Sequence, residues 1–348
     1  MKTIKTDVTI VGAGPAGLFS VFELGLLGLN AHVIDSLAEV GGQCSTLYPD
    51  KPIYDIPAIP RINAQDLIDQ LVTQAAPFNP TYHLNQQVTH LEQLEDRSFI
   101  LKTSLGIVFY TKTVILAAGL GSFRERPLRL PGIEKFVETN LHYSVKDINQ
   151  FKGRKIVILG GGDSAIDWAL SLSRLSSSLT LVHRREEFRA TPSSVEQMKK
   201  LANKSGANVR YMIGRVTDYA HTSGHIVSID VKAFGEDSEK KERVSLDDLL
   251  VFYGLTPDLG PISDWGLNLD KRHIDADPET FETNISGIFA IGDINSYPGK
   301  KKLILCGFHE AALAAYSIQK YLDPNTKQRV QYTTTSSLLH KRLGVTKN

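Results

Sequence analysis

The chain has 348 residues, 42% of them hydrophobic, which is enough to build two domains with separate cores. Its 39 lysines and arginines nearly balance its 38 aspartates and glutamates, which argues against a nucleic-acid-binding protein. No apolar run has the length of a signal segment or a membrane span, so we expect neither. Cys44 and Cys306 are far apart in sequence, which excludes a disulfide framework and predicts a reducing, cytoplasmic location.

The first motif is a glycine fingerprint near the N-terminus. The β-branched run Val8–Val11 predicts a strand, and a helical pattern begins at Leu18. Between them stands the loop Gly12-Ala13-Gly14-Pro15-Ala16-Gly17. Its first glycine permits the tight turn, the second lets a pyrophosphate approach the backbone, and the third lets helix and strand pack closely. This order of strand, loop and helix predicts a site for an adenine dinucleotide.

An acidic residue completes this first site. The next predicted strand, Ala31–Ile34, ends at Asp35, which follows the glycines by about 20 residues. A carboxylate at that place accepts hydrogen bonds from a ribose 2′-hydroxyl.

A second fingerprint in the middle of the chain differs at the corresponding position. The run Lys155–Leu159 predicts a strand, and Ile166–Leu175 predicts a helix. The loop between them is Gly160-Gly161-Gly162-Asp163-Ser164-Ala165. The next strand, Leu179–Val182, ends in no acid but in His183, Arg184 and Arg185, with Arg189 beyond. Guanidinium groups bind the 2′-phosphate that a carboxylate repels, so we interpret this site as one for NADPH, against the alternative of a solvated basic strand end.

Further blocks extend the two fingerprints into a family pattern. They are Gly41-Gly42-Gln43, Ile115–Gly119, His183–Ala190 and Ile288–Asp293. With them the chain resembles the flavoprotein pyridine-nucleotide reductases of the thioredoxin-reductase type over nearly its whole length. The resemblance implies that the first fingerprint binds FAD together with Gly42 and Gln43. It also implies that Gly292 and Asp293 contact the ribityl and phosphate region of the flavin, and it implies no metal.

Strands that alternate with helices predict an α/β fold with parallel sheets. We expect two Rossmann-like domains, with the NADPH domain inserted into a discontinuous FAD domain. The predicted bounds are 1–118 and 246–348 for the FAD domain and 119–245 for the NADPH domain. The run Leu249–Tyr253 is expected to return the chain to the FAD domain.

The cysteines separate the enzymes of this type. A disulfide reductase needs an attacking and a resolving thiol close together. The stretch Leu141–Asp147, where thioredoxin reductases carry their cysteine pair, has none. Cys44 matches one position of the pair in the glutathione-reductase type, but the partner position is Pro49. We interpret Cys44 as a packed apolar residue and keep a single reactive thiol as the alternative.

Other blocks resemble the ferredoxin/flavodoxin-NADP(+) reductases of the thioredoxin-reductase-like kind. The segment Leu47–Pro57 is similar to their flavin-contacting segment, in which Tyr48 stacks on the isoalloxazine and which includes Asp55. The resemblance further implies that Val88 contacts the adenosine end of FAD and Phe123 the ring region. A C-terminal tail over the flavin is implied too, with Ser336 contacting it. Thr334 stands where relatives carry a ring, so either Tyr332 covers that face with a shifted register or the face is more open.

The resemblance predicts an oxidoreductase that transfers electrons between NADPH and ferredoxin or flavodoxin, acting as a homodimer. No protein residue acts as nucleophile or base in this interpretation, because the cofactors supply the chemistry. Acidic carriers are expected to be steered by Arg124, Arg126, Arg129 and Lys300–Lys302. Two alternatives remain: an NADPH-dependent reductase of another acceptor that uses Cys44, and an FAD/NADPH redox sensor.

Overall fold

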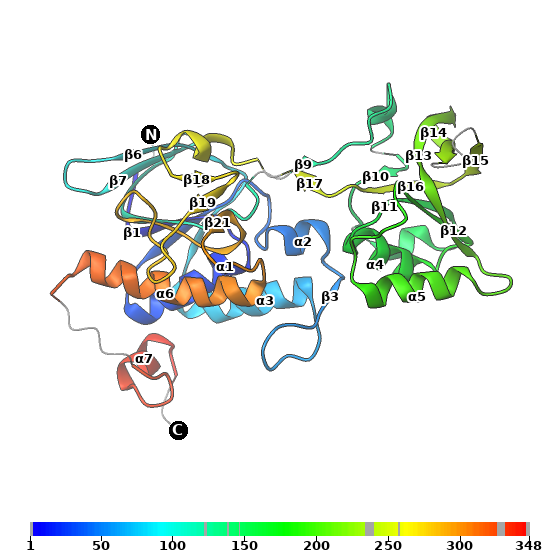
Figure 1. The fold of residues 1–348 in the computed structure, drawn as a ribbon. Coiled ribbons are helices and arrows are strands. Elements are labelled where there is room, and N and C mark those ends of the chain that lie inside the picture. The colour runs from blue at the N-terminus through cyan, green and yellow to red at the C-terminus, as the bar shows by residue number, and fades with distance from the viewer. Residues whose placement is uncertain are drawn as a thin grey trace. The chain divides into compact units, whose positions relative to one another are not determined.

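The computed structural model describes residues 3–121, 124–137, 139–145, 147–233, 240–256, 258–325 and 331–345. The chain forms two compact units. The first comprises Met1–Phe123 and Pro257–Asn348, and the second comprises Arg124–Thr256. Figure 1 shows that each unit has its own sheet and its own helices.

The second unit ends later than the predicted bound at residue 245. Strand β16 (Asp248–Phe252) pairs in parallel with β11 (Lys155–Gly160) and with β10 (Leu141–His142). The run expected to return the chain to the first domain is therefore a strand of the second sheet. Its side chains are buried on both faces of that sheet, which explains why it does not leave the unit. The chain passes between the two units twice. Next to these passages, β9 (Arg124–Glu125) and β17 (Leu255–Thr256) pair with each other as antiparallel strands.

The main sheet of the first unit has a parallel centre. Its strand order is β5-β2-β1-β8-β7-β6. The second half of β8 pairs with β20, while its first half pairs with β7. The strands are β1 (Thr3–Val11), β2 (Ala31–Ile34), β5 (Thr81–His83), β6 (Val88–Gln93), β7 (Phe99–Thr103), β8 (Val108–Leu116) and β20 (Ile288–Ala290).

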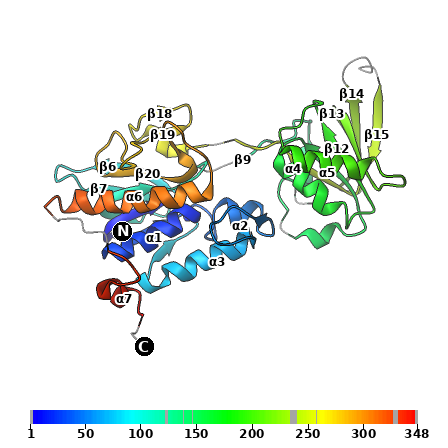
Figure 2. The ribbon, with the colours of Figure 1, turned by 60° about the horizontal axis from the view of Figure 1, so that its bottom comes forward.

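Two layers cover this sheet because its strand residues alternate between the faces. Val8 and Ile10 of β1 pack into the core under the helices, whereas Val11 packs into the core on the other side. The helices α1 (Pro15–Leu27), α3 (Ala64–Ala75) and α6 (Ile304–Leu322) lie side by side on one face (Figures 1 and 2). On the opposite face lie η5 (Gly260–Asp264) and the small sheet of β18 (Leu269–Asp270), β19 (His273–Asp275) and β21 (Asn295–Ser296).

The sheet of the second unit has the strand order β10-β16-β11-β12-β13-β14-β15. Neighbouring strands from β10 to β13 pair in parallel, whereas β14 pairs antiparallel with β13 and with β15. Helices α4 (Asp163–Leu172) and α5 (Pro192–Ala202) share a core with Ile156 and Ile158, while Val157 and Leu159 face the other core. The remaining elements of this unit are β12 (Ser178–His183), β13 (Val209–Thr222), β14 (His225–Ala233), β15 (Lys241–Ser245), η2 (Ile133–Phe136) and η3 (Ile148–Phe151).

Short elements of the first unit connect the larger ones. They are α2 (Gln43–Leu47), β3 (Pro52–Ile53), β4 (Ile62–Asn63), η1 (Ala76–Phe78), η6 (Gly292–Ile294) and the terminal α7 (Ser337–Arg342). Among the described residues, no helix combines the length and the hydropathy of a transmembrane span.

Candidate dinucleotide sites

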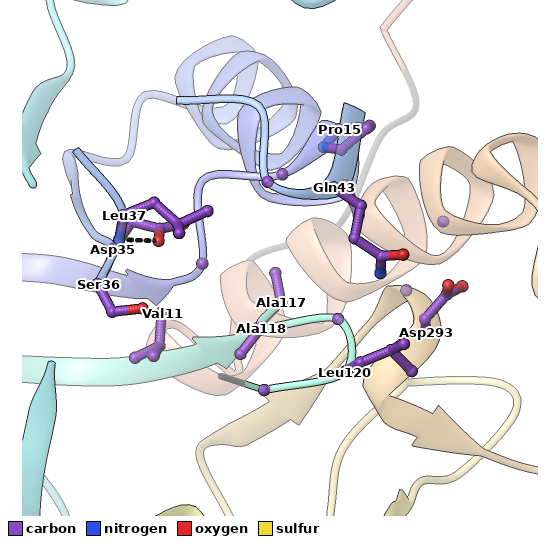
Figure 3. A pocket seen from close by; sticks show the side chains of 18 of the residues that line it. Val11, Pro15, Asp35, Ser36, Leu37, Gln43, Ala117, Ala118, Leu120 and Asp293 are labelled. Atoms are coloured by element: carbon purple, nitrogen blue, oxygen red, sulfur yellow. Dashed lines mark hydrogen bonds between the residues drawn. The ribbon is translucent and has the colours of Figure 1, made fainter. Parts of the chain in front are cut away.

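A cavity of about 310 Å³ lies at the carboxyl ends of β1, β2 and β8 in the first unit. Ligands of open α/β sheets bind at this edge, because the loops that leave adjacent strands diverge there. Figure 3 shows Pro15 and Gln43, Asp35 and Leu37, and Ala117 and Asp293 around this space. Of the residues predicted for FAD, it is lined by Gly12, Gly14, Pro15, Ala16, Asp35, Gly42, Gln43, Tyr48, Val88, Gly292 and Asp293.

The phosphate loop has the geometry that its glycines predict. Gly12 has a φ of +111°, and a Cβ there would lie 2.4 Å from the carbonyl oxygen of Ala117. A Cβ at Gly17 would lie 2.0 Å from the carbonyl oxygen of Gly12, so Gly17 is needed for packing and does not line the cavity. At Gly14 no atom lies within 4 Å of such a Cβ. Gly14 therefore leaves room for a phosphate at the N-terminus of α1, where backbone N–H groups attract anions.

Asp35 connects the end of β2 to this loop. Its Oδ2 accepts a hydrogen bond from the N–H of Ala13 at 2.6 Å, and its Oδ1 accepts one from Leu37 at 2.9 Å, drawn in Figure 3. Burial raises the pKa of this carboxyl, and the backbone hydrogen bonds partly oppose the rise. A carboxylate has about four acceptor sites, so Asp35 can still accept from a ribose hydroxyl in the cavity.

Cys44 and Tyr48 meet across one turn of α2. The Cys44 thiol is 2% exposed and donates to the Tyr48 hydroxyl at 3.7 Å. Burial raises the pKa of Cys44 to about 11, so this thiol is protonated at neutral pH. Burial also raises the pKa of Tyr48, as do the adjacent Cys44 and, less strongly, Asp293 and Asp55. Because the reactive form of a cysteine is the thiolate, a protonated Cys44 is not a nucleophile. The arrangement therefore supports a role for Cys44 in packing and in positioning the Tyr48 phenol.

The Gly292-Asp293 turn enters the cavity from the second part of the first unit. Lys300 lies behind it, with its side chain 8% exposed and paired with the fully buried Glu310. Lys300 is therefore not a surface charge, and the expectation that it steers a carrier is wrong. Lys301 and Lys302 are exposed, and Lys302 lines the cavity with its Nζ 2.6 Å from Nε2 of His273.

Some predicted residues do not line the cavity. Asp55 is exposed in the segment between β3 and β4. Phe123 lies outside the described residues. Gln86, Leu259 and Ile262 line the cavity without belonging to any motif, so the sequence did not predict them. Lys302 was expected only as a surface charge, and no role was expected for Glu310.

No residue of the described tail, residues 331–345, lines the cavity of its own chain. The Arg342 guanidinium donates to the carbonyl oxygen of Leu26 near the C-terminal end of α1, and Leu339 is buried. That end is separated from Pro15 by a helix of 13 residues, about 20 Å long. The expected cover by Thr334 and Ser336 is thus absent within this chain: Thr334 is exposed, and Ser336 caps α7 by accepting from Leu339 N.

The second fingerprint forms a phosphate loop before α4. Gly160 has a φ of +153°, and a Cβ there would lie 2.5 Å from the carbonyl oxygen of Phe252. Gly162 stands at the N-cap of α4 with no atom within 4 Å of a Cβ, and Ala165 is buried in the core. Asp163 and Ser164 are in the first turn of α4, so this helix presents its N-terminus as the first one does.

The basic segment after β12 is tied to this loop. Arg189 N donates to the carbonyl oxygen of Gly161 at 2.7 Å, and Thr191 N donates to Oδ1 of Asp163 at 2.9 Å. Arg184, Arg185 and Arg189 are exposed, and within the described part of the chain none pairs with a carboxylate. They are available for an anionic group beside the loop.

His183 takes a packing position in this segment. Its ring lies over Gly161, where a Cβ would be 2.3 Å from the imidazole, and it stacks on Phe188 with ring centroids 5.0 Å apart. Burial lowers the pKa of His183, and the nearby arginines lower it further. A neutral imidazole leaves the binding of a phosphate charge to the guanidinium groups.

Comparison with known proteins identifies the family of this chain. The model of the pyridine nucleotide-disulphide oxidoreductase family matches residues 6–315. Ferredoxin-NADP reductase 2 of Cupriavidus taiwanensis is 54% identical over 99% of this chain and 92% of its own. Ferredoxin-NADP reductase of a Bradyrhizobium species is 49% identical over 99% of both chains.

Solved structures show the same fold at lower identity. Thioredoxin reductase of Lactococcus lactis is 24% identical, with a TM-score of 0.77, over 91% of this chain and 99% of its own. Thioredoxin reductase of T. acidophilum is 22% identical, with a TM-score of 0.77, over 92% of this chain and 99% of its own. The chain therefore belongs to the pyridine nucleotide-disulphide oxidoreductase family, and within its thioredoxin-reductase-like fold it groups with the ferredoxin-NADP reductases.

Proposed function

We propose that this protein is an FAD-containing reductase that transfers electrons between NADPH and ferredoxin or flavodoxin. The reaction is two reduced ferredoxins plus NADP+ and a proton, giving two oxidised ferredoxins and NADPH. The observation that carries the proposal is a dinucleotide cavity that contains a single, buried thiol, in a chain about half identical to ferredoxin-NADP reductases.

The first unit is the proposed FAD domain. The α1 N-terminus and Gly14 would hold the pyrophosphate, Asp35 the ribose, and Tyr48 one face of the ring. When bound, FAD accepts two electrons as hydride and releases them one at a time. The protein supplies the apolar lining that excludes water and the hydrogen bonds that orient the cofactor.

The second unit is the proposed NADPH domain. The loop at Gly160–Gly162 would hold the pyrophosphate, and Arg184, Arg185 and Arg189 the 2′-phosphate. Since Arg189 N and Thr191 N bond to the loop itself, the basic segment and the phosphate loop keep a fixed spacing. This spacing is what recognition of both phosphates in one molecule requires.

The proposal excludes a disulfide relay. The two cysteines are free, and Pro49 stands where a resolving partner of Cys44 would be. Cys44 is the only described cysteine that lines the cavity, and its thiol is protonated, so the electrons that a bound FAD would supply would pass to an external one-electron carrier. Flavodoxin as a second carrier and a homodimer are parts of the same proposal that come from the family resemblance. A cytoplasmic location is the part that comes from the two distant cysteines.

The test is NADPH-driven cytochrome c reduction by the purified, FAD-loaded protein. Ferredoxin and flavodoxin are added separately as mediators, and thioredoxin-coupled disulfide reduction is measured in the same preparation. We expect stimulation by at least one carrier and no thioredoxin activity. Stimulation by thioredoxin alone would overturn the proposal, and NADPH oxidation that no carrier accelerates would favour another acceptor.

A further inference from the structure

Glu310 of α6 is a fully buried carboxylate with a specific set of donors. Its side chain is 0% exposed. Oε2 accepts from Gly292 N at 2.6 Å and from Asn295 Nδ2 at 3.1 Å, and Oε1 accepts from the Tyr297 hydroxyl at 2.9 Å. Lys300 Nζ also donates to Oε1. All four donors come from the one segment that follows β20, so a single side chain fixes the path of this segment against α6.

Both polar atoms of Gly292 are held by this ion pair. Its N–H donates to Glu310, and its carbonyl oxygen accepts from Lys300 Nζ at 2.8 Å. The peptide groups on either side of Gly292 therefore cannot rotate without breaking a bond to a buried charge. Hydrogen bonds to charged groups are stronger than those between neutral groups, and they are not exchanged for water at a buried site.

The held residue is the neighbour of a cavity-lining carboxylate. Gly292 and Asp293 both line the proposed FAD cavity, whereas Lys300 and Glu310 do not. Gly292 adopts a φ of +75° and packs against the phosphate loop, since a Cβ there would lie 3.3 Å from Cβ of Ala16. A shift of Gly292 would consequently move Asp293 and disturb the contact with the start of α1.

We propose that Lys300 and Glu310 are positioning residues, whose ion pair holds the Gly292-Asp293 turn in the geometry that binds the flavin. The proposal rests on the proposed FAD site and adds to it residues that touch no cofactor. A buried ion pair is weak evidence for stability, because apolar or neutral replacements of both partners are often tolerated. The hydrogen bonds to Gly292 give the pair a different role, which is to hold the Gly292-Asp293 turn in one conformation.

This distinction can be tested by removing both charges together. Lys300→Met and Glu310→Gln each leave a buried charge unpaired, so both single variants should be less stable. The double variant has no unpaired charge, and the amide that replaces the Glu310 carboxylate retains an acceptor for the Gly292 N–H. This variant lacks the donor to the Gly292 carbonyl. We therefore expect a melting temperature of the apoprotein near that of the unmodified chain, with FAD bound about tenfold or more weakly and an altered visible circular dichroism of the bound flavin.

The control is the more exposed ion pair of Lys112 and Asp7, which joins β8 and β1 at 2.8 Å and does not line the cavity. Lys112→Met with Asp7→Asn should leave the FAD affinity and the flavin spectrum unchanged. Glu310→Asp retains the charges but shortens the reach to Gly292, and it should also weaken FAD binding. It supplies the result if the double variant does not fold.

The outcomes separate the two proposals. Unmodified protein that binds no FAD would refute the proposed function. Unmodified protein that binds FAD, together with a folded double variant of the same FAD affinity and spectrum, would refute only the positioning role. An FAD affinity in Glu310→Asp equal to that of the unmodified protein would refute it as well.

Discussion

The carboxylate of Asp35 accepts a hydrogen bond from the backbone N–H of Ala13 at 2.6 Å. This bond joins the residue after β2 to the phosphate loop after β1, so the acid expected for ribose recognition also shapes the loop. The second oxygen accepts from Leu37, which orders the next part of the cavity wall. One side chain therefore couples the ribose and phosphate parts of the site.

Replacement of Asp35 should lower FAD affinity in two steps. Asp35→Asn keeps one acceptor oxygen and should weaken FAD binding about tenfold, since hydrogen bonds to a charged group contribute about 1.5–3 kcal/mol. Asp35→Ala removes both acceptors and should weaken it further. FAD titration of the apoprotein, followed by flavin fluorescence, measures both. The exposed Glu39→Gln is the control, and equal affinities for all variants would contradict the assignment.

The two glycines at either end of the first turn should respond differently to alanine. Gly12→Ala puts an alanine where the backbone has a positive φ and places its Cβ against the Ala117 carbonyl. We therefore expect a loss of about 2 kcal/mol or more in the free energy of unfolding. Gly14→Ala meets no protein atom and should leave the apoprotein stable while weakening FAD binding. Thermal unfolding of the apoproteins and FAD titration separate the effects. A stable Gly12→Ala protein would show that the backbone relaxes there.

Arg184→Ala combined with Arg185→Ala should reduce the preference for NADPH over NADH. Each charge-assisted contact to a 2′-phosphate contributes about 1.5–3 kcal/mol, so the ratio of kcat/KM values should fall roughly 100-fold or more. Diaphorase assays with both nucleotides give this ratio. Arg174→Ala, another exposed arginine of the second unit, should not change it. An unchanged ratio in the double variant would place the phosphate elsewhere.

Cys44→Ser should retain carrier-dependent activity within a few-fold. Burial raises the pKa of this thiol to about 11, so the thiol is protonated at pH 8, whereas the nucleophile is the thiolate. In a Cys306→Ser background, iodoacetamide should label Cys44 slowly at pH 8 and progressively faster toward pH 11. Loss of all activity in Cys44→Ser would support the single-thiol alternative.

The raised pKa of Cys44 also predicts how the free energy of unfolding changes at alkaline pH. Its pKa is raised by folding above the ordinary value of 9.0, so the unfolded chain releases the proton first. The contribution of Cys44 to the free energy of unfolding is fully present below about pH 9 and is lost as the pH rises toward about 11. Unfolding of the apoprotein in urea at pH 8 and at pH 10.5 measures the loss, which should be smaller in Cys44→Ser. An equal loss in both proteins would contradict the burial of this thiol.

Local pattern was sufficient for both phosphate loops. A tight turn between a strand and a helix requires a positive φ at Gly12 and at Gly160, and a close approach of the backbone at Gly17. They concern residues close together in the chain, so glycine spacing and the flanking apolar runs reveal them. The position of Asp35 follows from the same unit, because β2 pairs in parallel with β1.

Contacts between distant segments could not be predicted in this way. Strand β16 looks the same in sequence whichever sheet it joins, and only its pairing with β11 places it in the second unit. Arg342 lies at the end of α1 through a bond to Leu26 that no local pattern encodes. The sequence by itself determined the two dinucleotide loops and their order. Tertiary structure decided that Lys300 is buried against Glu310, because the burial of a charge depends on which distant segments pack around it.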